Sequence, residues 1–167
     1  FYNKVYASNI KEDTTIYISS YAGFNKLVEQ ISPSLINKNS FIWVAEQKNY
    51  PKKIKAGKYY LKKGINNNDL INLLRSGNQT PLKLSFNNQE TLEKLAGRIA
   101  QQIEPDSISL LKAFKDSKFL SNNNFTKQTA LGMYIPNSYE VYWNTSATRF
   151  RDKMLKEYQR FWTPKRK

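Results

Sequence analysis

The amino-acid sequence predicts an α+β protein in which small helices cover short strands. Three segments share one pattern, in which a β-rich run leads through a turn rich in Gly or Asn to a helix. The 167 residues are 40% hydrophobic and 14% aromatic, which is enough apolar material to form a buried core. No run approaches the roughly 18 apolar residues that a membrane-spanning helix requires. Either a true repeat or a coincidence of ordinary strand–helix connections accounts for the shared pattern.

The first half of the chain predicts the order strand, helix, helix, strand. Asn37–Ser40 carries side chains that start helices, and Gly77 is a typical helix stop. The βααβ order over residues 15–62 is that of small carbohydrate-binding modules. The expected elements are a strand at Ile16–Ile18, a helix around Leu27–Ile31, a helix over 39–48, a strand at Lys58–Leu61 and a helix around Leu70–Leu74.

The second half continues with another strand and a series of helices. Apolar residues recur at helical spacing after the expected strand, and again near the end of the chain. The polar run Ser121–Asn124 indicates an exposed loop. The expected elements are a strand at Leu82–Phe86, helices over Leu92–Ile103 and Ser107–Phe114, an aromatic segment over Met133–Trp143 and a helix over Ala147–Trp162.

The composition excludes several kinds of chemistry. The chain contains neither Cys nor His, which excludes disulfides, Cys/His zinc sites, thiolate nucleophiles and a Ser-His-Asp triad. Acid–base chemistry must therefore come from one of 13 Asp and Glu residues, or from Lys or Tyr. We expect no cofactor and no metal ion.

The chain is strongly basic, with 27 Lys+Arg residues and a formal net charge of +14. Such a charge attracts polyanions, whether through a solvated basic surface or through a specific site. The excess is mainly lysine, whereas recognition of bases and phosphates favours the planar guanidinium group of arginine. Nucleic acid is therefore not the expected partner.

The segment from Leu131 to Thr145 is the strongest candidate for a binding site. It holds four large aromatic residues interleaved with Asn, Ser and one carboxylate. Flat rings stack on the apolar faces of sugars, while amides, hydroxyls and carboxylates bind sugar hydroxyls. The alternative is that the aromatic residues belong to the core or to an edge strand. If the segment is extended, Glu140 shares a face with Ser138 and Tyr142, opposite Tyr139 and Val141.

Part of this segment resembles the Glu-Gly-x-Leu/Phe-x-Pro-Asp-Thr-Tyr motif of the endolytic murein transglycosylase family, formerly labelled aminodeoxychorismate lyases. Further stretches at Lys55–Leu61, Asp69–Gly77 and Leu84–Leu95 resemble the family's motifs in the same order. The resemblance implies a juxtamembrane segment over residues 1–13 and a LysM-like glycan-binding subdomain over 14–80. Residues 81–167 then form the amino-terminal part of an incomplete catalytic domain.

The resemblance implies cleavage of the β-1,4 bond between N-acetylmuramic acid and N-acetylglucosamine. One carboxylic acid protonates the glycosidic oxygen, and the C6 hydroxyl of the muramic acid then forms a 1,6-anhydro ring. The family's catalytic Glu stands where this chain has Leu131, and its Asp stands where this chain has Asn137. Three hypotheses follow: Glu140 takes over the acid role, a Glu outside this chain supplies it, or the protein only binds glycan.

The predicted site therefore has one catalytic candidate, Glu140, and a set of glycan-binding candidates. The resemblance also implies peptidoglycan strands as the partner, a transmembrane anchor upstream, and a place on the periplasmic side of the bacterial inner membrane. Cell-wall synthesis proteins are further partners in this scheme, and the 167-residue chain alone is expected to be inactive. The predicted glycan-binding residues are Tyr134, Asn137, Ser138, Tyr139, Tyr142 and Trp143.

Overall fold

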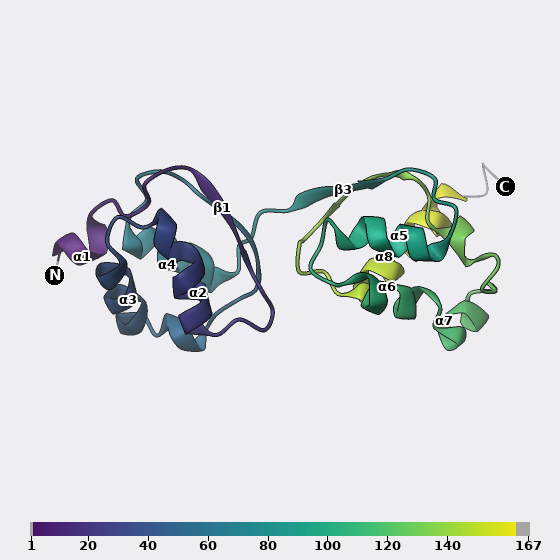
Figure 1. Cartoon of the computed structure of the whole chain (residues 1–167), viewed down its shortest axis with the longest axis horizontal. Helices are drawn as coiled ribbons and strands as arrows, with labels where there is room; N and C mark the ends of the chain where they lie inside the picture. The colour runs from purple at the N-terminus through teal and green to yellow at the C-terminus, as the bar shows by residue number, and fades with distance from the viewer. Residues whose placement is uncertain (1, 163–167) are drawn as a thin grey trace. The chain divides into compact units, whose positions relative to one another are not determined.

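A computed structural model describes residues 2–162 (Figure 1). Phe1 of the predicted juxtamembrane segment and residues 163–167 of the predicted catalytic part lie outside the described residues. The chain forms two compact units, Phe1–Pro81 and Leu82–Lys167, which meet one residue from the boundary that the sequence predicts. Both units mix helices with a small sheet, so the predicted α+β class is confirmed.

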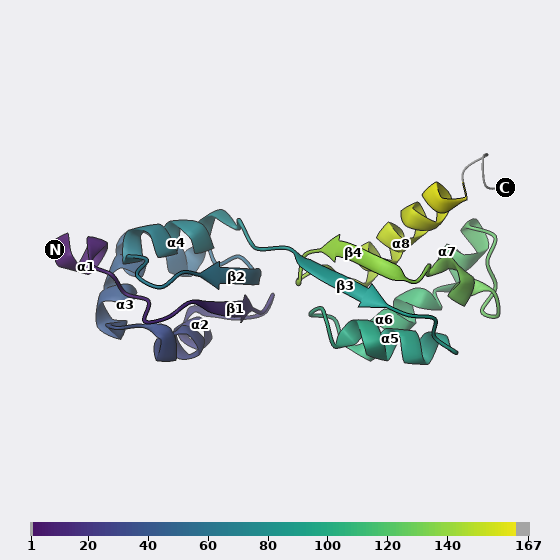
Figure 2. The ribbon, with the colours of Figure 1, turned by 90° about the horizontal axis from the view of Figure 1, so that it is seen from above.

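Unit 1 is built around a two-stranded antiparallel sheet. Figure 2 shows its strands β1 and β2 side by side, with Thr14 opposite Leu61 and Ile18 opposite Gly57. The amide of Asn37 starts α3 by accepting a hydrogen bond from the Ser40 backbone N–H at 3.0 Å. The elements of unit 1 are α1 (Tyr2–Tyr6), β1 (Thr14–Ile18), α2 (Phe24–Ile31), α3 (Lys38–Gln47), β2 (Gly57–Leu61) and α4 (Asn67–Ser76), with 3₁₀ turns at Ser32–Ser34 and Tyr50–Lys52.

The amino-terminal segment belongs to unit 1. Val5 of α1 is buried in the core of this unit, and α1 contacts α3 and α4. The buried amide of Asn67 donates to the Lys4 carbonyl at 2.7 Å and accepts from the Asn9 amide at 2.7 Å. These hydrogen bonds satisfy polar groups that would otherwise be costly to bury, and they hold residues 4–9 against α4.

Unit 2 also contains a two-stranded antiparallel sheet. Strand β3 pairs with β4, with Leu82 opposite Val141 and Phe86 opposite Asn137. In Figure 1 the helices α5, α6 and α8 lie on one side of β3. The elements of unit 2 are β3 (Leu82–Phe86), α5 (Leu92–Ala100), α6 (Ser107–Phe114), α7 (Ser117–Asn122), a 3₁₀ turn at Ala130–Met133, β4 (Asn137–Val141) and α8 (Ala147–Phe161).

Two details of unit 2 differ from the sequence expectation. The predicted loop Ser121–Asn124 begins inside α7, because the buried side chains of Phe119 and Leu120 anchor a short helix that ends at Asn122. The helix predicted over Leu92–Ile103 ends at Ala100. Ile103 is still buried, since the chain turns over the core after the helix ends.

The two units share one plan, in which a strand, two helices, a second strand and a final helix follow in order, with α1 before this series in unit 1 and the short α7 added within it in unit 2. In each unit a tyrosine in the middle of the second strand donates its hydroxyl to the carbonyl four residues earlier. Tyr59 donates to Lys55 at 3.0 Å and Tyr139 donates to Ile135 at 2.5 Å. The units differ in one connection, because residues 115–136 join the second helix to the second strand in unit 2 where residues 48–56 suffice in unit 1.

A buried arginine ties α8 to the rest of unit 2. The guanidinium of Arg151 donates to the Ala113 carbonyl at 3.1 Å and lies 3.9 Å from the centre of the Phe119 ring. It also pairs with Asp152 at 3.2 Å and Asp116 at 3.6 Å. The same side chain thus contacts the end of α6, the middle of α7 and its own helix.

We predict that Arg151→Ala lowers the free energy of unfolding by about 2–3 kcal/mol, because it removes a charged hydrogen bond and the contact with Phe119. Urea unfolding followed by circular dichroism measures the change. The matched control is Arg149→Ala on the exposed side of α8, which should change the free energy by less than about 0.5 kcal/mol. Equal effects of the two substitutions would contradict the structural role of Arg151.

Candidate functional site

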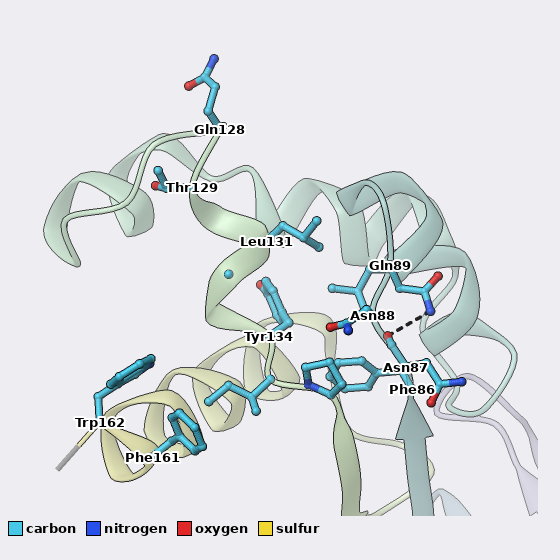
Figure 3. A pocket seen from close by; sticks show the side chains of 14 residues that line it. Phe86, Asn87, Asn88, Gln89, Gln128, Thr129, Leu131, Tyr134, Phe161 and Trp162 are labelled. Carbon is cyan, nitrogen blue, oxygen red and sulfur yellow. Dashed lines mark hydrogen bonds between the residues drawn. The ribbon is translucent and has the colours of Figure 1, made fainter. Parts of the chain in front are cut away.

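An open pocket of about 670 Å³ lies within unit 2 (Figure 3). Its volume falls within the range of about 300–1,000 Å³ that is usual for small-molecule sites. We call it the main pocket. The residues that line it are Phe86, Asn87, Asn88, Gln89, Leu95, Gln128, Thr129, Leu131, Gly132, Tyr134, Ile135, Pro136, Phe161 and Trp162.

Three parts of unit 2 form the walls of the main pocket. The loop Asn87–Gln89 begins where β3 ends, and Gln89 donates to the Asn87 carbonyl at 3.1 Å. The 3₁₀ turn before β4 brings Leu131 and Gly132 to the pocket. The end of α8 supplies Phe161 and Trp162, and Figure 3 shows these rings across from the loop that carries Asn88.

The lining combines aromatic rings with neutral amides. Trp162 and Phe161 are each more than one-third exposed, so their rings are available to a ligand. The side chains of Asn87, Asn88, Gln89 and Gln128 can each donate and accept hydrogen bonds. The residues that line the main pocket include no acidic or basic side chain. This chemistry suits an uncharged ligand that has apolar faces and hydroxyl or amide groups at its edges, as a sugar has.

Leu131 separates the main pocket from a smaller hollow of about 280 Å³, which we call the side pocket. Both pockets are lined by Leu131 and Gln128. The side pocket, unlike the main pocket, has charged walls. Its lining residues are Glu90, Thr91, Leu92, Glu93, Lys115, Lys127, Gln128 and Leu131.

Glu93, one of the carboxylates of the side pocket, is a poor proton donor. Glu93 accepts a hydrogen bond from the Lys115 ammonium at 2.6 Å, and this bond is the main reason why the pKa of Glu93 is lowered. A lowered pKa keeps the carboxylate ionised at neutral pH, whereas a general acid needs a raised one. Glu90 is largely exposed and pairs with Lys94 at 2.6 Å. Within residues 2–162, no group of three or more Asp or Glu residues is placed to hold a metal ion.

Glu140 lies on the exposed face of β4. Ser138, Glu140 and Tyr142 are exposed, whereas Tyr139 and Val141 are buried, which is the alternation that an extended segment predicts. Glu140 faces Lys83 on the neighbouring strand. It does not line either pocket. The structure therefore separates the one predicted catalytic carboxylate from the pocket beside Leu131.

The other predicted site residues divide between the pocket, the core and the surface. Tyr134 lines the main pocket and is 4% exposed, with its ring 4.6 Å from that of Phe114. Tyr139 packs in the core of unit 2. The pocket lining does not include Tyr139, Asn137, Ser138, Tyr142 or Trp143. Of the motif, Leu131, Gly132, Tyr134, Ile135 and Pro136 line the main pocket, whereas the strand β4 that follows does not.

Sequence reasoning missed several lining residues. Asn87 and Asn88 were expected only as turn residues, although a run of amides directly after a strand is also a signal for a polar binding loop. Phe161 and Trp162 were expected only as the end of an amphipathic helix. Gln128 and Thr129 carry no local signal, because only the fold of residues 115–136 brings them to the pocket.

Residues 2–162 thus form a two-unit α+β fold with a neutral, partly aromatic pocket in unit 2. The chain belongs to the YceG-like family, which it matches over residues 16–167. This is the family of the endolytic murein transglycosylase, so the resemblance carried by the Gly132–Tyr139 motif is confirmed.

Among solved structures, the chain is similar to that of the YceG-like protein lmo1499 from Listeria monocytogenes, determined at 2.6 Å. The sequences are 23% identical, the TM-score is 0.49, and the match covers 89% of this chain and 54% of the other. The chain therefore spans about half the length of that structure. No curated protein matches it significantly.

We expect loss of the hydroxyl group to lower the free energy of unfolding at Tyr139 but not at Tyr134. Burial raises the pKa of both, but only Tyr139 has a hydrogen-bond acceptor, whereas the buried Tyr134 hydroxyl has no partner among the described residues. Tyr139→Phe should lower the free energy of unfolding by about 1 kcal/mol, and Tyr134→Phe should leave it equal or higher. Chemical denaturation of both variants tests this, and a larger loss for Tyr134→Phe would contradict it.

Proposed function

We propose that the main pocket binds the glycan strands of peptidoglycan. The observation that carries the proposal is the place of the pocket, which is lined by Leu131–Pro136 of the family motif and by neutral amides and exposed rings. Rings that stack on sugars and amides that bind acetamido and hydroxyl groups suit a polymer of N-acetylated sugars. The positive charge of the chain, +14, further favours a partner that carries acidic groups.

We further propose that the full-length protein is an endolytic murein transglycosylase, which cleaves the N-acetylmuramic acid–N-acetylglucosamine bond and forms 1,6-anhydro ends. That reaction needs a carboxylic acid beside the glycosidic oxygen. Leu131 has no proton to donate, Glu140 lies outside both pockets, and the Lys115 hydrogen bond keeps Glu93 ionised. These observations favour a division of labour in which this chain binds the glycan and a carboxylate outside it supplies the proton.

A catalytically silent glycan-binding or scaffolding protein is the second candidate. Leu131 and Asn137 favour it, because they replace both acidic positions of the family motif with side chains that cannot act as acids. The pocket would be retained in such a protein, since stacking and amide hydrogen bonds do not depend on the lost carboxylates.

We also propose a role for unit 1 and a location for the protein in the cell. Unit 1 has the strand–helix–helix–strand order of small carbohydrate-binding modules, and we propose that it acts as a LysM-like glycan-binding module. We place the protein in the bacterial cell envelope, held by a membrane anchor and working beside cell-wall synthesis proteins. Within residues 2–162 no helix is both long enough and apolar enough to span a bilayer.

Pocket variants should lose binding to peptidoglycan while a strand-face variant does not. We expect Trp162→Ala to bind about three- to ten-fold more weakly, the effect of losing roughly 0.7–1.4 kcal/mol of ring stacking. Asn88→Ala removes an exposed amide from the opposite wall and should also weaken binding. The matched control is Tyr142→Ala, an exposed aromatic residue outside the pocket. Sedimentation with purified peptidoglycan measures all three, and a loss confined to Tyr142→Ala would refute the pocket as the glycan site.

Cleavage is tested by searching for 1,6-anhydro muropeptides after incubation with peptidoglycan. The 167-residue chain should bind but release none, because its pocket lacks a proton donor. In the full-length protein, Glu140→Gln should leave product release unchanged. If the full-length protein binds glycan and releases no anhydro product, the silent binding protein is the correct function. Product release by the chain alone would overturn the division of labour.

A further inference from the structure

The two units differ mainly in the connection between the second helix and the second strand, and this connection helps to line the pockets of unit 2. Unit 1 connects its second helix to its second strand through residues 48–56, whereas unit 2 uses residues 115–136. This longer connection carries α7 and supplies Lys115, Lys127, Gln128 and Thr129 to the pocket walls. The elements common to both units thus form the scaffold, and the longer connection of unit 2 contributes to the walls of both pockets.

The two pockets adjoin at shared lining residues, so an extended ligand that passes Leu131 can contact both. Gln128 and Leu131 line the main pocket and also the side pocket. A sugar stacked in the main pocket would therefore have a substituent within reach of the side pocket.

The charges of the side pocket leave one positive group available. Lys115 is paired with Glu93 at 2.6 Å, and Glu90 is paired with Lys94 at 2.6 Å. Lys127 is exposed and forms no ion pair with any residue in the 2–162 range. The main pocket contributes no charge to compensate it. An ammonium group beside a neutral sugar site favours an anionic substituent on the sugar.

We propose that Lys127 is a specificity-determining residue, which receives a carboxylate carried by the glycan strand in the side pocket. This inference rests on the proposed glycan-binding function of the main pocket. The carboxylate has two possible sources: the peptide attached to muramic acid, or the lactyl group of a muramic acid that carries no peptide. In either case the site selects a carboxylate-bearing amino-sugar polymer over an uncharged one.

The test compares binding of the chain to three polymers: intact peptidoglycan, peptidoglycan stripped of its peptides by an amidase, and chitin. Stripping hydrolyses the amide bond to the peptide and so frees the lactyl carboxylate, whereas chitin carries no carboxylate. We expect Lys127→Glu to weaken binding to carboxylate-bearing glycan about five- to ten-fold, since it replaces an attractive charge with a repulsive one. Chitin binding should not fall, and Lys127→Arg should keep the affinity of the wild type.

The matched control is Lys118→Glu, which makes the same charge change at an exposed lysine of α7 outside both pockets. It should change none of the three affinities by more than about two-fold. A defect of Lys127→Glu on intact peptidoglycan alone assigns the peptide carboxylate, a defect on stripped peptidoglycan alone assigns the lactyl carboxylate, and a defect on both shows that Lys127 accepts either carboxylate.

The outcomes separate failure of this inference from failure of the proposed function. If Lys127→Glu and Lys118→Glu have equal effects, or if chitin binding falls equally with Lys127→Glu, Lys127 has no specific role and the main pocket still stands as the glycan site. If the wild-type chain binds none of the three polymers, the proposed function itself is wrong.

Discussion

The fold depends on one constraint: a two-stranded sheet is not stable in water unless helices cover one of its faces. In both units the strands alternate buried and exposed residues, and the helices pack against the buried set. The same alternation decides what remains available for function. Because of it, Tyr139 and Val141 of β4 are buried in the core, and Glu140 lies on the exposed face.

Polar side chains that lose contact with water in the core form similar hydrogen bonds in the two units. Tyr59 and Tyr139 occupy corresponding places in their strands, and both hydroxyls reach the carbonyl four residues earlier. Unit 1 buries Asn67 with a full set of partners, and unit 2 buries Arg151 against the end of α6. Tyr50 of unit 1 and Tyr134 of unit 2 depart from this rule, since their buried hydroxyls have no partner in the described part of the chain, and Tyr134 lines the main pocket.

Both pockets lie where the plan of the two units diverges. The connection that is longest in unit 2, residues 115–136, lines both pockets together with the loop after β3. It ends in the family motif, in which Leu131 stands at the acid position. A neutral, partly aromatic pocket beside a charged hollow is suited to binding a polymer of substituted sugars, and less suited to proton transfer. The chemistry of the walls thus favours recognition as the contribution of this chain.

The sequence by itself determined most of the helices and strands, because periodic burial and capping residues such as Asn37 are local signals. It also determined the family, through a motif that keeps its glycine, proline and tyrosine while losing its acids. It did not determine α7, since a helix of that length depends on the burial of Phe119 and Leu120. Only the tertiary structure decided which residues share a pocket. Asn88, Gln128 and Trp162 come from three distant segments, and no local pattern encodes a contact whose free energy arises only when the core between them has formed.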